Sequence, residues 1–172
     1  MEEKLQKPGY AALRRFRESK SGATYFITAN LAGRGPVLES AELTDAVSQH
    51  WRNLEADGSW TVRTAVVMPD HLHLLVDLSG RTSLAEGMRM FKSRLTPAMR
   101  GHGLKWQEGF YEHQMRESDD MLPVFLYIYL NPYRADLLQV DQIWPGYHCC
   151  PEDWKWFGGL TRESMPQPEW LR

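Results

Sequence analysis

Apolar residues near the start of the chain follow first the period of a strand and then that of a helix. Residues 24–29, TYFITA, are aromatic and β-branched and have a glycine outside each end, which predicts a buried strand. From about 40 to 55 apolar side chains recur every three or four positions, the spacing of one helical face: Leu43, Val47, Trp51 and Leu54. An Asp-Gly pair then provides a stop, so a helix is expected over 40–55.

The segment from 60 to 78 predicts a pair of strands. Residues 60–68 are rich in Val and Thr, and a Pro-Asp pair separates them from 71–78, HLHLLVDL. Successive side chains of a strand point to opposite faces. Two sets of side chains therefore face apart: His71, His73 and Leu75 against Leu72, Leu74 and Val76. We expect an antiparallel hairpin with one face in the core and imidazoles on the other.

The pattern then turns helical again. Ser83 and Glu86 form a capping box, which marks a helix N-terminus. Apolar residues follow on one helical face, and Pro97 and Gly101 are expected to end the helix. Residues 106–115 fit a fourth strand. The order βαββαβ predicts an α+β fold, a ferredoxin-like antiparallel sheet with both helices on one face.

A third helix is expected after the fourth strand. Ser118, Asp119 and Asp120 suit a helix N-terminus, because their oxygens accept hydrogen bonds from unpaired backbone amides. The apolar run VFLYIYL continues the helix, and Asn131-Pro132 is expected to end or bend it. We place this additional C-terminal helix on the open face of the sheet. The pattern is less regular from 145 onward, so we expect one domain over 1–160 and a tail over 161–172.

Composition narrows the class of protein. The 172 residues carry a net charge of −2, and the longest apolar run is far shorter than the roughly 20 residues of a membrane span. The first ten residues lack the apolar core of a secretory signal, which predicts a cytoplasmic protein with no membrane partner. Cys149 and Cys150 are adjacent and cannot link distant segments, so two reduced thiols are expected.

Basic residues gather in two segments despite the acidic balance. Residues 81–105 hold six Lys and Arg against one acid, and the first twenty residues hold another six. Such clusters are most often solvated faces, and the alternative is phosphate binding. The residues predicted to contact nucleic acid are Arg14, Arg15, Arg89, Lys92 and Arg94. Aromatic residues that could stack on unpaired bases are Trp106, Phe110, Trp154 and Trp156, although most are expected in the core.

The histidine strand and the third helix suggest a metal site. Two histidines separated by one residue on a strand can aim at one cation, although an isolated pair is more often hydrogen-bonded than metal-bound. Tyr127 and Asn131 are four residues apart and share a helical face. If that face covers the histidines, Asn131 can offer an amide oxygen beside the hydroxyl of Tyr127. Two imidazoles and one neutral oxygen fit Mg²⁺ or Mn²⁺.

A phenol beside a metal-held phosphate suggests nucleophilic chemistry. Attack of Tyr127 on DNA phosphorus would leave a covalent phosphotyrosine and a free 3′-hydroxyl. The alternative is that Tyr127 only packs an amphipathic helix, and Tyr129 points elsewhere on that helix and is expected to be structural.

Three blocks in this order and spacing carry a resemblance to a known family: MPDHLHLLV, KWQEGFYEHQMR and YIYLNPYRADLL. The chain resembles the REP-associated tyrosine transposases, relatives of the single-tyrosine HUH transposases of small insertion sequences. The resemblance implies that His71, His73 and Asn131 bind the divalent metal and that Tyr127 attacks single-stranded DNA. It also implies nicking and joining at REP-type hairpins through a 5′-phosphotyrosine, by a monomer or homodimer acting at the bacterial nucleoid.

The chain departs from the pattern of that family at three positions. Asp70 replaces a common asparagine, Tyr129 a histidine, and Asp136 a usual glycine. The acid at position 70 would either support a metal ligand or lie in the turn without a role. None of the departures removes a predicted ligand or the nucleophile, and His113 matches a position whose role the resemblance leaves open. Another function stays open on the same fold, a non-catalytic DNA or RNA hairpin-binding protein.

Overall fold

The computed structural model describes residues 19–32, 41–139 and 142–163. Its elements follow the order β1 Thr24–Asn30, α1 Ala41–Ala56, β2 Trp60–Val67, β3 His71–Leu78, α2 Leu84–Gly101, β4 Tyr111–Gln114, α3 Leu122–Arg134, β5 Tyr147–Cys149 and α4 Pro151–Glu163. Within these ranges no helix is both long and apolar enough to span a membrane.

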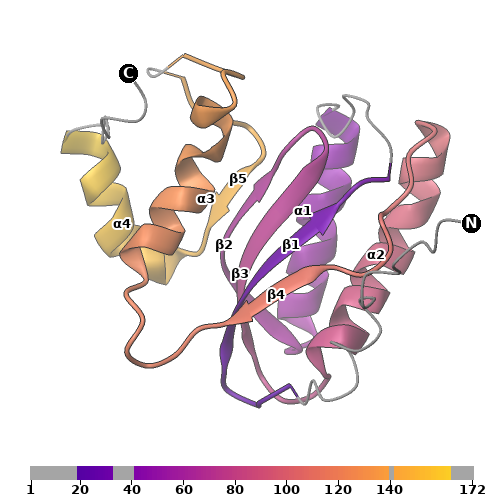
Figure 1. Ribbon diagram of the computed structural model, residues 1–172, viewed down its shortest axis with the longest axis horizontal. Helices are drawn as coiled ribbons and strands as arrows, with labels where there is room; N and C mark the ends of the chain where they lie inside the picture. Colours follow the sequence, from indigo (N-terminus) through magenta and orange to yellow (C-terminus); the bar gives the residue numbers. More distant parts are fainter. Residues whose placement is uncertain (1–18, 33–40, 140–141, 164–172) are drawn as a thin grey trace, which may run out of the picture.

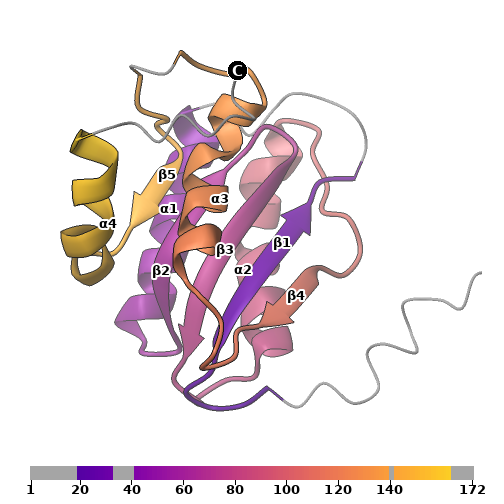
Figure 2. The same ribbon diagram turned by 60° about the vertical axis from the view of Figure 1, so that its left-hand side comes forward.

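The strands form one antiparallel sheet in the order β4-β1-β3-β2-β5. Helices α1 and α2 cover one face of it, and α3 and α4 lie on the other side (Figures 1 and 2). The first four strands and two helices are the predicted ferredoxin-like βαββαβ unit, which is confirmed. Strand β5 extends it at the edge formed by β2.

Two apolar cores flank the sheet, one on each face. Leu72, Leu74 and Val76 join the core beneath α1 and α2, whereas Leu75 joins the core beneath α3 and α4. The predicted alternation along 71–78 is therefore confirmed. His73, buried to 4% exposure, lies on the face that α3 covers.

Of the two residues predicted to end α2, Gly101 is confirmed and Pro97 is wrong. The helix continues through Pro97 to Gly101, although proline inside a helix costs about 3 kcal/mol. Leu95 and Met99 lie on either side of Pro97 and are fully buried, and each such burial contributes about 1.5–3 kcal/mol. Packing of the apolar face thus outweighs the lost backbone hydrogen bond. The capping box is confirmed in part, since the amide of Glu86 donates to Ser83 Oγ.

Strand β4 is shorter than predicted. Only Tyr111–Gln114 pairs with β1, and Trp106 makes a separate bridge to Leu31. Between them Gly109 adopts a φ of 73°, a left-handed conformation that interrupts an extended strand.

Helix α3 continues past Asn131-Pro132, which was expected to end or bend it. Pro132 is buried inside the helix, and Tyr133 packs against Tyr129 and donates its hydroxyl to the carbonyl of Gln142. These contacts hold one more turn in place. As a result Asn131 lies within the helix, one turn after Tyr127. Asp120, predicted at the N-terminus, accepts a hydrogen bond from the amide of Leu122.

The region after 145 contains two elements that the sequence pattern did not predict, β5 and α4. A signal for the helix was present, because Pro151 occupies the first turn together with Glu152 and Asp153. The helix continues to Glu163, across the domain boundary expected at 160, and residues 164–172 of the expected tail lie outside the described residues. Cys149 and Cys150 are free thiols, and burial raises the pKa of each, to about 12 and about 11.

A bidentate ion pair fastens α4 to the sheet. Arg63 of β2 donates from Nε and Nη2 to Asp153, at 2.9 and 2.7 Å, and Trp156 Nε1 and Cys150 Sγ also donate to this carboxylate. Burial alone would raise the pKa of Asp153, but these hydrogen bonds hold it below its usual value. Because the unfolded chain binds this proton more readily, the stabilisation is present at neutral pH and is lost as the pH falls through the depressed pKa.

We expect Asp153→Ala to lower the free energy of unfolding by about 3 kcal/mol at neutral pH, because it leaves the guanidinium of Arg63 partly buried without its counter-charge. Urea denaturation followed by circular dichroism measures this loss. Glu152→Ala, at the exposed neighbouring position, is the matched control and should change little. An equal loss in both variants would contradict the assignment of the ion pair.

Candidate active site

The two histidines of β3 direct their rings at one point. His71 Nε2 lies 3.0 Å from His73 Nε2, and the ring centroids are 4.6 Å apart. Two ligand nitrogens each about 2.1 Å from one cation, at right angles to each other, would also be about 3 Å apart. The pair therefore fits a shared divalent cation. The same distance fits an N–H···N hydrogen bond between the two rings.

Both histidines are held from behind by their other ring nitrogens. Asp70 Oδ1 lies 2.6 Å from His71 Nδ1, and Thr28 Oγ1 lies 2.8 Å from His73 Nδ1. An ionised carboxylate only accepts hydrogen bonds, so Asp70 fixes the proton of neutral His71 on Nδ1 and leaves a lone pair on Nε2. Asp70, the departure noted in the sequence, thus contacts a predicted ligand directly.

His73 is an uncharged imidazole at neutral pH. Burial and the neighbouring His71 lower its pKa to about 3, against a smaller opposing effect of Asp70. A neutral ring is the form that binds a metal or accepts a hydrogen bond. Its ring stacks on Phe26 of β1, with centroids 5.4 Å apart. Phe26 and Thr28 thus form the wall that orients His73.

Tyr127 reaches the histidines from α3. Its ring centroid lies 5.1 Å from that of His73 and 5.9 Å from that of Phe26, and the side chain is 39% exposed. The guanidinium of Arg134 lies over the same ring, 5.5 Å from its centroid. The phenol is therefore packed on one side and open to solvent on the other. By contrast, Tyr129 is buried among Tyr133, Tyr147 and Phe157. This burial agrees with the structural role that the sequence predicted for it.

Asn131, the third predicted ligand, is half-buried one helical turn after Tyr127 and shares its face. Among the described residues no three His, Cys, Asp or Glu side chains gather as a metal-binding group. The chemistry of the predicted set differs from such groups, because it combines two imidazoles with an amide oxygen.

The predicted DNA contacts on α2 lie away from this site. Arg89 and Arg94 are exposed on α2, which covers the opposite face of the sheet. Lys92 has internal partners, since its Nζ donates to the carbonyls of Gln107 and Gly109 and lies 5.4 Å from the centroid of the Trp106 ring. Arg14 and Arg15 lie outside the described residues. The role of these five residues in DNA binding stays a prediction.

Three residues of the site were not singled out from the sequence: Phe26, Thr28 and Arg134. The strand period does place Phe26 and Thr28 on one face of 24–29. Only the register Thr28↔His73 shows that this face adjoins the imidazoles. Arg134 enters because α3 continues beyond Pro132.

Comparison with known proteins first gives the class. Residues 19–120 match the family model described as "Transposase IS200 like", and the chain belongs to this transposase family.

Individual relatives are more specific. The chain is 30% identical over 130 residues to the REP-associated tyrosine transposase of Escherichia coli strain K12. This alignment covers 72% of this chain and 74% of that protein. A second relative, from Haemophilus influenzae, is 27% identical over 161 residues, covering 80% of this chain and 90% of the relative. A solved structure of a REP-associated tyrosine transposase bound to a REP hairpin superposes with a TM-score of 0.65 at 26% identity, covering 87% and 86% of the two chains.

Proposed function

We propose that this protein cleaves and rejoins single-stranded DNA beside REP-type hairpins, with Tyr127 as nucleophile. The phenolic oxygen bonds to phosphorus, and the bond from phosphorus to the 3′-oxygen breaks. The product is a 5′-phosphotyrosine and a free 3′-hydroxyl, which takes up a proton as the phenol loses one. Return of a 3′-hydroxyl to the phosphotyrosine rejoins a strand.

One observation carries this proposal, the contact of Tyr127 with His73 between α3 and β3. The ring centroids of Tyr127 and His73 are 5.1 Å apart, although the two residues are far apart in sequence. A tyrosine that only packed the helix would be buried in the apolar core, as Tyr129 is. Tyr127 instead contacts His73 and Phe26, has the guanidinium of Arg134 over its ring and is 39% exposed. In the proposed arrangement a single copy supplies both the nucleophile and the imidazoles.

His71, His73 and Asn131 are the residues that would hold Mg²⁺ or Mn²⁺. Their fit rests on the convergent Nε2 atoms and on the hydrogen bonds that fix the opposite ring nitrogens. A bound cation would polarise the phosphate and stabilise the negative charge of the transition state. Arg134 places a second positive charge beside the phenol, where it can contact the phosphate.

The substrate class follows from the relatives, one of which has been solved in complex with a REP hairpin. The proposal is tested with an imperfect-palindrome hairpin that carries a single-stranded flank, incubated with Mn²⁺. With the label at the 3′ end, the labelled fragment should stay attached to the protein through denaturation in detergent. With the label at the 5′ end, a shorter free fragment should appear. Chelation of the metal with EDTA should remove both products, and duplex DNA should give neither.

Binding of the hairpin without either product would favour the alternative function. The protein would then be a non-catalytic hairpin-binding member of the family. Cleavage that leaves no covalent adduct would instead reject the tyrosine mechanism and point to attack by water.

A further inference from the structure

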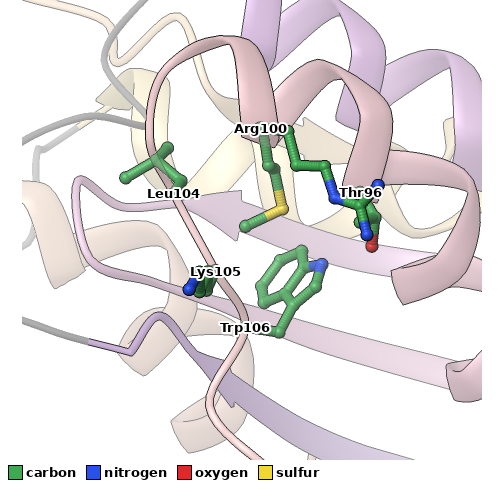
Figure 3. A pocket seen from close by; sticks show the side chains of 6 residues that line it. Thr96, Arg100, Leu104, Lys105 and Trp106 are labelled. Carbon is green, nitrogen blue, oxygen red and sulfur yellow. The ribbon is translucent and has the colours of Figure 1, made fainter.

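A cavity of about 280 Å³ lies at the C-terminal end of α2 (Figure 3). Its lining comes from the last turns of that helix and from the segment that follows: Thr96, Met99, Arg100, Leu104, Lys105 and Trp106. The volume is near the lower end of the range for ligand pockets, about 300–1,000 Å³. It suits a single flat ring rather than a large ligand.

The lining combines apolar side chains with two positively charged ones. Trp106, Met99 and Leu104 supply the apolar part, while the exposed side chains of Arg100 and Lys105 lie at the rim. The indole nitrogen of Trp106 points toward Thr96 and has no hydrogen-bond acceptor within the described ranges. A flat apolar ring linked to an anionic group matches this lining. A nucleotide has that chemistry.

The indole is held firmly in position. Lys92 lies over its ring and binds the carbonyls of Gln107 and Gly109, and Phe91 packs with a centroid distance of 6.4 Å. Lys92 therefore fixes the segment after α2. A rigid aromatic surface loses little conformational freedom when a base packs against it.

The cavity lies at the same end of the sheet as the histidines. The amide of Ala32 donates to the carbonyl of Lys105, and that of Leu31 donates to the carbonyl of Asp70. The end of β1 therefore lies between two neighbouring segments at this end of the sheet, the one that contains Trp106 and the turn before His71. Neighbouring strands are about 4.8 Å apart, so the backbones of the Trp106 and His71 segments are separated by roughly 10 Å. Trp106 packs on the face of the sheet that α1 and α2 cover, whereas Tyr127 lies on the other face. A DNA strand held at Tyr127 would therefore pass around this end of the sheet to reach the cavity, over several nucleotides.

We propose that this cavity binds one unpaired base of the DNA strand that flanks the hairpin. The base packs against Trp106, and Arg100 and Lys105 contact the adjoining phosphates. This inference rests on the proposed function for its substrate, but it concerns binding and not chemistry. The cavity would set how far from the hairpin the strand is presented to Tyr127.

The test is a binding measurement in the Tyr127→Phe background with EDTA, so that no strand is cleaved. Fluorescence anisotropy gives the affinity for a labelled hairpin with a single-stranded flank, and for a series in which one flank position at a time is abasic. We expect one abasic position to weaken binding about tenfold, and Trp106→Leu to weaken binding of the intact flank by a similar factor. When Trp106→Leu is combined with that abasic position, the affinity should fall little further than with either change alone.

Arg100→Ala and Lys105→Ala keep the proposal testable if Trp106→Leu fails to fold, because both side chains are exposed. Each should weaken binding several-fold and reduce the slope of log affinity against log salt by about one. Arg52→Ala, an exposed arginine of α1, is the matched control.

Two results would overturn the pocket. In the first, the losses of affinity from Trp106→Leu and from each abasic position multiply, so that no position is coupled to Trp106. In the second, Arg100→Ala and Lys105→Ala lower the affinity no more than Arg52→Ala does. Either result could accompany normal adduct formation by the wild-type protein, and the pocket alone would then fail. Coupling of Trp106 to one base without any adduct would support the pocket while the proposed chemistry failed.

Discussion

Replacing Tyr127 with phenylalanine should reduce formation of the covalent protein–DNA adduct by at least about a thousandfold, because the substitution removes the attacking oxygen. The phenylalanine ring can keep the contacts with His73 and Phe26. Hairpin affinity and thermal stability should therefore stay close to wild type. The adduct is measured by detergent gel with the 3′-labelled hairpin, and affinity by anisotropy.

The matched control for this variant is Tyr111→Phe. Tyr111 is 52% exposed on β4 and its ring lies 6.4 Å from that of Phe26. Among the tyrosines that the structure describes, it is therefore the one most able to substitute as a nucleophile near the site. Tyr111→Phe should retain the adduct. An adduct that persists in Tyr127→Phe and disappears in Tyr111→Phe would reject Tyr127 and transfer the role to β4.

Loss of either histidine should weaken Mn²⁺ binding at least about a hundredfold, because removal of a ligand costs more than removal of an outer partner. We choose His71→Ala, at a half-buried position, and His73→Phe, which preserves a ring stacked on Phe26. Free Mn²⁺ is measured by electron paramagnetic resonance in the Tyr127→Phe background with hairpin present. This arrangement supplies the phosphate without turnover.

Asp70→Ala and His102→Gln complete that comparison. Asp70 contacts His71 Nδ1 and no predicted metal-facing atom, so its loss should cost about tenfold in Mn²⁺ affinity. His102 lies at the end of α2, outside the site, and its replacement should cost nothing. Unchanged Mn²⁺ affinity in both His71→Ala and His73→Phe would reject the ligand assignment, even if adduct formation fell.

The sequence predictions agree best with the structure where polar and apolar residues repeat regularly within a single helix or strand. The alternation along 71–78 predicted the face of each residue, because a strand buried on both sides must separate its side chains in this way. The helical spacing of Tyr127 and Asn131 predicted a shared face for the same reason. These are local properties of the backbone.

Prolines were the main source of error. Pro97, together with Gly101, was expected to end one helix, and Asn131-Pro132 to end or bend another. Both prolines lie inside their helices. Each helix continues because the residues beyond the proline are buried, Met99 in one and Tyr133 in the other. The cost of a proline is local, but the compensating burial comes from partners distant in sequence. A pattern within one segment does not contain that information.

The sequence by itself determined the order of the ferredoxin-like elements, the face that carries His71 and His73, and the pairing of Tyr127 with Asn131 on one helix. Only the tertiary structure decided that α3 lies over those imidazoles, that Phe26 and Thr28 hold His73, and that Trp106 forms a cavity at the same end of the sheet. The first set follows from backbone periods within single elements. The second depends on strand register and on the packing of helices against the sheet, where contacts between remote segments set the free energy.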